Sequence, residues 1–222
     1  MFQKELENLK DIFLEKLNVI HILSKEFQDV DVLNGRIDEN KIKLLLSRKV
    51  IDTLKLVDEH PDQFSVSVMS AHSNYEKLAQ LAKEYQPDLV VISDSRYERA
   101  LAACLLGTSI RVTSGADALC EAARIPVDCV VAGIVGFAGL MPVWAAVQAG
   151  QIIALANKET LVVAGHLIMP LAATSGATLL PVDSEHNAIA QCLVGARDED
   201  INKVVLTASG GPFRDLSRTQ MH

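Results

Sequence analysis

The sequence predicts an α/β protein with a Rossmann-like, largely parallel sheet and helices on both faces. From residue 65 onwards, apolar stretches of about five residues alternate with amphipathic segments of about ten residues. Residues 89–92 are apolar throughout, which is typical of a strand that is covered on both sides. At 222 residues and 49% hydrophobic content, the chain can bury a sizeable core. Strands that alternate with helices imply right-handed crossovers and a parallel sheet.

The individual elements follow from periodicity. Residues 74–85 place Leu78, Leu81, Ala82 and Tyr85 on one helical face. The other helices are expected at 97–106, 116–123, after residue 139, at 160–174 and at 187–193. The strands are expected at 65–70, 89–92, 110–112, 129–132, 152–155, 178–182 and 203–207.

Composition and charge exclude several classes of protein. The net charge of −7 and the pI near 5.4 exclude a basic nucleic-acid-binding surface. Residues 1–9 are charged and contain no apolar signal region, and no run of about 18 apolar residues predicts a membrane span. We therefore expect a cytoplasmic protein with no membrane partner. The four cysteines have no C-x-x-C spacing and are expected to be small core residues.

The segment LLPVDSEHN at residues 179–187 carries the most chemical information. If the strand continues to Glu185, its period of two aims Asp183 and Glu185 in the same direction, where they can bind a hard divalent cation. The alternative is an ordinary helix start, in which Ser184 or Asp183 caps the following helix. In either case His186 and Asn187 are expected to have structural roles.

Two further strand ends carry polar residues. The segment at 154–162 contains Lys158 in a polar turn, and the segment at 204–214 ends in a small-residue loop that contains Ser209. Parallel strands bring their carboxyl ends to one edge of the sheet. Together with Asp183 and Glu185, these residues suit a phosphorylated substrate that is chelated to a metal ion. Alone, Lys158 would be read as a solvated surface lysine.

Four motifs occur in order: AGIVGFAGLMP at 132–142, LANKETLV at 155–162, LLPVDSEHNAI at 179–189 and LTASGGPFR at 206–214. From about residue 53 to residue 222, the chain closely resembles the 1-deoxy-D-xylulose 5-phosphate reductoisomerase family. The resemblance implies rearrangement of this sugar phosphate and its reduction by NADPH to 2-C-methyl-D-erythritol 4-phosphate, with Mg²⁺ or Mn²⁺. These are steps of non-mevalonate isoprenoid biosynthesis. Family members are usually homodimers.

The resemblance also implies roles for individual residues. Asp183 and Glu185 would bind the metal ion, and Lys158 would join them as a catalytic residue. The substrate-binding residues would be Lys158, Ser184, Glu185 and Ser209.

The cofactor side is implied at three places: the loop His72, Ser73 and Asn74, the strand end at Ala132, and the pair Asn157 and Glu159. The family usually carries a lysine or arginine in the first loop for the 2′-phosphate of NADPH. Here His72 is the nearest substitute, so the preference for NADPH over NADH stays open. Asn74 is equally well explained as a helix N-cap.

The N-terminal region departs from the family. Members open with a Gly-Ser-Thr-Gly-Ser-Ile-Gly turn that holds the cofactor pyrophosphate, whereas residues 44–50 of this chain read LLLSRKV. Residues 1–43 resemble a ferredoxin-NADP reductase-type module, namely the reductase of phenylacetyl-CoA oxygenase. A fusion, a frameshift or an assembly error would each explain such a junction.

The expected domains are therefore a foreign segment at 1–43, an incomplete NADPH-binding domain at 44–182, and the start of an α+β metal- and substrate-binding catalytic domain at 183–222. Family members continue beyond this point, so we expect this chain to be an inactive fragment. The alternatives are another dinucleotide-dependent dehydrogenase and a non-catalytic binding fragment. Metal dependence would distinguish a reductoisomerase from the former.

Overall fold

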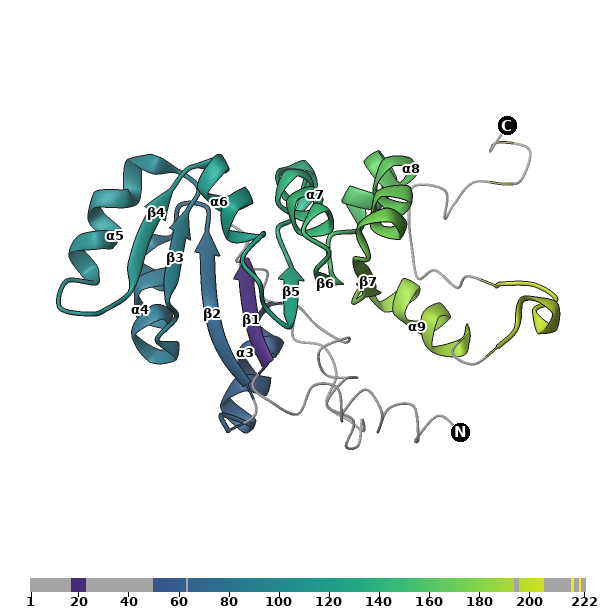
Figure 1. The fold of residues 1–222 in the computed structure, drawn as a ribbon, viewed down its shortest axis with the longest axis horizontal. Coiled ribbons are helices and arrows are strands. Elements are labelled where there is room, and N and C mark those ends of the chain that lie inside the picture. The colour runs from purple at the N-terminus through teal and green to yellow at the C-terminus, as the bar shows by residue number, and fades with distance from the viewer. Residues whose placement is uncertain are drawn as a thin grey trace.

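A seven-stranded parallel sheet forms the centre of the molecule. The computed structural model describes residues 17–22, 50–62, 64–193, 196–205, 217 and 220. Within them the strand order is β4-β3-β2-β1-β5-β6-β7, and every pair of neighbours is parallel (Figure 1). The strands are β1 (Leu17–Ile22), β2 (Phe64–Ala71), β3 (Leu89–Ile92), β4 (Arg111–Ser114), β5 (Cys129–Ala132), β6 (Ile152–Leu155) and β7 (Thr178–Pro181).

Helices connect successive strands, and polar caps determine where several of them begin. The Asn74 side chain accepts a hydrogen bond from the Lys77 amide (3.1 Å) at the start of α4, and Asn157 caps α8 in the same way. The α-helices are α3 (Val50–Glu59), α4 (Tyr75–Tyr85), α5 (Glu98–Cys104), α6 (Ala116–Ala122), α7 (Leu140–Gln148), α8 (Lys158–Ser175) and α9 (Ser184–Leu193). Short 3-10 helices are η1 (Ser95–Tyr97), η2 (Gly136–Gly139) and η3 (Asp198–Asp200).

The core lies on both faces of the sheet. In β3, Leu89 and Val91 pack into a cluster with residues of α6, α7 and α8, while Val90 and Ile92 pack with residues of α3, α4 and α5. All four residues of this strand are buried, because neighbouring side chains point to opposite faces and both faces are covered. The predicted α/β fold with helices on both faces is confirmed. Trp144 packs against the first cluster, as expected for a core residue.

Strand β1 was not expected from the sequence. Leu17–Ile22 pairs with β2 on one side and with β5 on the other, so it occupies the middle of the sheet. The chain order reverses between β1 and β5, which makes their carboxyl ends the topological switch point where open α/β sheets bind ligands. A segment within residues 1–43 therefore completes the sheet on which the family-like sequence folds.

Two other expectations need correction. The strand expected at 203–207 is not seen in its described part: residues 201–205 form no strand, and Val204 and Val205 are exposed. An apolar pair alone therefore did not predict a covered strand. Residues 206–207 lie outside the described part. Of the four cysteines only Cys129 is buried, and Cys192 is exposed at the end of α9. No helix in the described ranges is both long and apolar enough to cross a membrane.

Candidate functional site at the carboxyl edge of the sheet

The loops that follow the strands leave one edge of the sheet side by side. Backbone hydrogen bonds continue beyond the paired strands: Ala156 N donates to Ala132 O (3.1 Å), and Val182 N donates to Leu155 O (3.0 Å). The residues that follow β6 and β7 are therefore hydrogen-bonded to the ends of the neighbouring strands. Polar residues at these positions are brought together by the sheet although they are far apart in sequence.

Lys158 and Asp183 meet at this edge. Lys158 is the first residue of α8, after β6, and Asp183 lies between β7 and α9. The Lys158 Nζ atom lies 2.9 Å from Asp183 Oδ2, and the side chains are 52% and 17% exposed. Lys158 is thus a half-exposed lysine that is ion-paired, and its catalytic role stays a prediction. Here a fixed positive charge contacts a largely buried carboxylate between neighbouring strands.

The backbone of the Asp-Ser-Glu motif follows one of the two alternatives that the sequence left open. Strand β7 ends at Pro181 and α9 begins at Ser184, so the period of two does not extend to Glu185. The Asp183 carbonyl accepts a hydrogen bond from Asn187 N (2.8 Å), as the residue before a helix does. Of the two alternatives that the sequence left open, the structure shows the helix start, because the helix begins within the motif. The side chains of Ser184 and Glu185, and all of Ser209, lie outside the described part of the structure.

The residues after the motif support the helix. Asn187 is buried, its Nδ2 atom donates to Pro181 O (2.8 Å), and its Oδ1 atom accepts from Gln191. The structural role predicted for Asn187 is confirmed. The His186 Nδ1 atom lies 3.8 Å from Asp183 Oδ2, beyond hydrogen-bond distance.

Asn157 joins the loop after β5 to the start of α8. The Asn157 side chain is buried. Its Oδ1 atom accepts hydrogen bonds from the backbone amide (2.9 Å) and the hydroxyl (3.0 Å) of Thr160. Its Nδ2 atom donates to the carbonyl of Ile134 and to the carbonyl of Gly136, which lies 2.9 Å away. This single side chain holds the residue before Lys158 against the loop that leaves β5. Its role as a cofactor ligand stays a prediction, as do those of the neighbouring Glu159 and of the buried Ala132.

Gly139 is packed tightly beside this amide. A Cβ atom on Gly139 would lie 2.3 Å from Asn157 Nδ2 and 2.8 Å from Ile134 O, which is too close for any side chain. Glycine is therefore required at position 139 because the Asn157 side chain and the Ile134 carbonyl approach its Cα closely.

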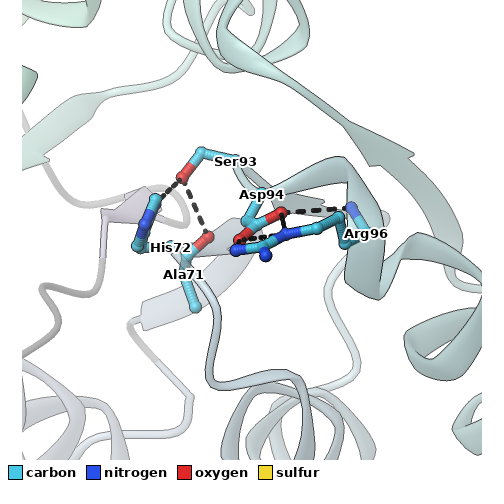
Figure 2. A network of polar contacts seen from close by, with 5 residues as sticks. All are labelled: Ala71, His72, Ser93, Asp94 and Arg96. Atoms are coloured by element: carbon cyan, nitrogen blue, oxygen red, sulfur yellow. Dashed lines mark hydrogen bonds and ion pairs between the residues drawn. The ribbon is translucent and has the colours of Figure 1, made fainter.

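A second polar group lies at the ends of β2 and β3. His72 Nδ1 lies 3.0 Å from Ser93 Oγ, and Asp94 N donates to His72 O (2.9 Å), so the two loops are joined (Figure 2). Arg96 donates from Nε (3.0 Å) and Nη2 (2.7 Å) to the Asp94 carboxylate. These hydrogen bonds lower the pKa of Asp94 to about 2.

Sequence reasoning singled out His72, Ser73 and Asn74 in this region but missed the second loop. Asn74 is the N-cap of α4, in agreement with the simpler of its two interpretations. The missed signal was the sequence Ser93-Asp94-Ser95-Arg96 directly after a buried strand, since polar residues at such a strand end face the ligand edge.

Donor chemistry at Asp183 fits a hard cation. Its carboxylate is largely buried and already holds a positive charge at 2.9 Å. Among the side chains that the structure describes, no three His, Cys, Asp or Glu residues converge on one point. The role of Asp183 as a metal ligand therefore stays a prediction.

Comparisons with known proteins agree with the motifs. A family model described as 1-deoxy-D-xylulose 5-phosphate reductoisomerase matches residues 51–165, and its C-terminal domain model matches residues 179–222. The reductoisomerase of Chloroherpeton thalassium is 46% identical over 170 residues, which cover 76% of this chain and 44% of that protein. That of Trichlorobacter lovleyi is 48% identical over 166 residues, with coverages of 74% and 43%. The chain thus spans less than half the length of these relatives.

Solved structures give the same result. The Zymomonas mobilis reductoisomerase in complex with NADPH superposes with a TM-score of 0.74 at 36% identity, over 92% of this chain and 49% of that one. A reductoisomerase in complex with magnesium gives a TM-score of 0.72 at 35% identity over the same shares. One with NADPH, fosmidomycin and magnesium gives 0.66 at 36% identity, over 81% and 40%. With a family model matched over more than half of its residues, this chain belongs to the 1-deoxy-D-xylulose 5-phosphate reductoisomerase family.

Proposed function

We propose that this chain contributes the cofactor-binding half and the first catalytic residues of a 1-deoxy-D-xylulose 5-phosphate reductoisomerase. The contact between Lys158 and Asp183 carries the proposal, because it brings together two residues that the motifs select independently. A different dinucleotide-dependent dehydrogenase would share the sheet but would not require a carboxylate at the end of β7. The complexes of relatives with NADPH and with magnesium support the same reading.

In the proposed reaction, NADPH supplies the hydride and Mg²⁺ or Mn²⁺ supplies positive charge at the substrate oxygens. Asp183 would bind the cation together with Glu185. Lys158 holds the Asp183 carboxylate at 2.9 Å and would offer its ammonium group to the substrate. Ser184 and Ser209 would donate hydrogen bonds to the sugar phosphate.

The cofactor would lie along the switch point between β1 and β5. Its nicotinamide half would meet Ala132, Asn157 and Glu159, and its adenosine half would meet the loop of His72, Ser73 and Asn74. The Asn157 hydrogen bonds favour this arrangement, since they fix the loop after β5 against the residue that precedes Lys158. A cofactor held there would be next to the Lys158 and Asp183 pair.

We also propose the domain division that the sequence suggests: residues 1–43 of separate, reductase-like origin, residues 44–182 for the cofactor, and residues 183–222 for metal and substrate. The family model begins at residue 51, so it leaves the proposed first segment outside the part that it matches. In this proposal a segment of separate origin supplies β1. The homodimeric state and cytoplasmic location usual for the family belong to the same proposal.

A chimera tests the proposed reaction. Residues 53–222 would replace the matching part of the Chloroherpeton thalassium enzyme, which is 46% identical and supplies the remaining segments. We expect oxidation of NADPH that depends on both 1-deoxy-D-xylulose 5-phosphate and Mn²⁺. Asp183→Asn should lower the rate by about a hundredfold or more, because the metal loses a charged ligand.

Asp88→Asn is the matched control. Asp88 is an exposed carboxylate directly before β3, at the opposite edge of the sheet, and its change removes the same charge. This variant should keep the parent rate. Full activity of Asp183→Asn would remove Asp183 from the site, and a rate independent of metal would favour the dehydrogenase alternative.

A further inference from the structure

The loops after β2 and β3 lie side by side, and the second carries an arginine, Arg96. The amide of Ser93 donates to Ala71 O (2.9 Å) and that of Asp94 donates to His72 O (2.9 Å), so the two strand ends are joined through their backbones. Figure 2 shows the Arg96 side chain folded back over Asp94, toward the loop of Ala71 and His72. In dinucleotide-binding sheets this edge receives the adenosine ribose, and an arginine there accommodates a 2′-phosphate.

The Arg96 guanidinium is held in place but retains binding capacity. Asp94 accepts from Nε and Nη2, whereas Nη1 makes no hydrogen bond among the described residues. The group lies 5.9 Å from the centre of the Tyr97 ring, and Tyr97 in turn stacks on Tyr75 with ring centres 5.6 Å apart. The side chain is 80% exposed, so a ligand can reach the Nη1 edge. A guanidinium fork presented in this way matches the oxygens of a phosphate.

We propose that Arg96, supported by His72 and Ser93, recognises the 2′-phosphate of NADPH and takes over the role for which the β2 loop lacks a lysine or arginine. The inference rests on the proposed function, since it takes the adenosine half of NADPH as the ligand. His72 Nδ1 and Ser93 Oγ, 3.0 Å apart, provide further hydrogen-bonding groups on these two loops. Asp94 orients Arg96 and opposes the incoming anion by its charge. The balance between Arg96 and Asp94 therefore determines the ratio of the affinities for a 2′-phosphorylated ribose and for an unphosphorylated one.

The test uses the full chain and two small probes, adenosine 2′,5′-bisphosphate and adenosine 5′-monophosphate. Ligand-detected NMR titrations give both dissociation constants, and their ratio measures recognition of the 2′-phosphate. We expect the wild type to bind the bisphosphate roughly tenfold more tightly. Arg96→Ala should bring the ratio close to one, and Arg96→Lys should give an intermediate ratio, because it keeps the charge but loses the fork.

Two further variants separate recognition from a structural effect. Arg99→Ala removes an equally charged, exposed arginine three residues away and should leave the ratio unchanged. Asp94→Asn removes the opposing charge and should raise the ratio about threefold or more, which a merely structural role of the pair would not produce. A ratio unaffected by Arg96→Ala, or lowered equally by Arg99→Ala, would overturn the proposal.

The outcomes for this inference and for the proposed function are distinct. If neither probe binds to the wild type, both the adenosine site and the role of Arg96 are overturned. If both probes bind equally, only the role of Arg96 is overturned. If the ratios follow the expectation while the chimera is inactive, the 2′-phosphate site stands and the proposed reaction fails.

Discussion

Two ion pairs lie on the same edge of the sheet and differ in how they are built. Arg96 and Asp94 are two residues apart and come from a single loop after β3, whereas Lys158 and Asp183 come from different loops, after β6 and β7. In both pairs the cation is exposed and the carboxylate is largely buried, at 12% and 17% exposure. The first pair requires only a local turn, while the second forms only when β6 and β7 are paired.

This difference has a consequence for function. A local pair can be gained or lost by changes in one loop, which suits a residue that adjusts specificity at the cofactor end. A pair that bridges two strands depends on the sheet, so it suits a reaction centre whose geometry must be precise within about 0.5 Å. Strand β1 lies between the half that carries the first pair and the half that carries the second.

The largest effect is expected from removing β1. A chain that lacks residues 1–43 leaves β2 and β5 without their shared partner in the middle of the sheet. Because a domain is typically stable by only about 5–15 kcal/mol, we expect the loss of the central strand to abolish the cooperative unfolding transition measured by circular dichroism. A deletion variant with a cooperative transition and a retained Lys158–Asp183 contact would show that the two halves assemble without β1.

The next effect concerns the loop that positions Lys158. Gly139→Ala should lower the free energy of unfolding by about 1–3 kcal/mol, because the added Cβ meets Asn157 and Ile134. Gly165→Ala, within α8, is the control: its Cβ would meet Leu161 at an ordinary 3.8 Å. It should raise stability by about 0.5–1 kcal/mol through helix propensity. Urea denaturation of the full chain measures both, and equal effects would contradict the close packing at Gly139.

A smaller effect is expected in the half of the sheet that carries Arg96. The Tyr85 hydroxyl of α4 donates to Asp58 Oδ1 of α3 at 2.7 Å, and burial together with this hydrogen bond raises the pKa of Tyr85. Tyr85→Phe should cost about 1 kcal/mol, since it removes a hydrogen bond to a charged group. Tyr75→Phe removes a longer contact of 3.3 Å to the exposed Glu76 and should cost less than Tyr85→Phe. Urea denaturation of the two variants measures the difference, and a lower midpoint for Tyr75→Phe than for Tyr85→Phe would contradict it.

The sequence predicted the half of the sheet with β5, β6 and β7 more fully than the half with β2, β3 and β4. Strands at 129–132 and 152–155 have the expected bounds, because short apolar runs between turns define buried parallel strands well. The Lys158 and Asp183 contact followed from the rule that strand ends share an edge.

The sequence did not predict β1, because Leu17–Ile22 contains Asn18 and His21 and stands within a segment assigned to another origin. Nor did it predict the Arg96 and Asp94 pair, since charged residues in a polar loop look alike whether they are solvated or paired. In both cases the deciding information is tertiary: which strands are neighbours and which loops touch. For the Asp-Ser-Glu motif the sequence left a continuing strand and a helix start open for a local reason, because caps and strand ends use the same polar residues.

The smallest effect concerns the titration of Asp94. The Arg96 hydrogen bonds lower the pKa of this carboxyl to about 2, from its ordinary value of 3.8. Because the pKa is depressed in the folded state, the contribution to stability is fully present above pH 3.8 and is lost as the pH falls toward 2. We expect Arg96→Ala to return the pKa of Asp94 toward 3.8, as measured by NMR titration of its carboxyl carbon.

Asp200, whose pKa Arg197 lowers in the same way in a separate loop, should titrate identically in both proteins and serves as the internal reference. An Asp94 pKa that does not move in Arg96→Ala would mean that the guanidinium is not held over this carboxylate in solution, and the positioned fork proposed for the 2′-phosphate would lose its support.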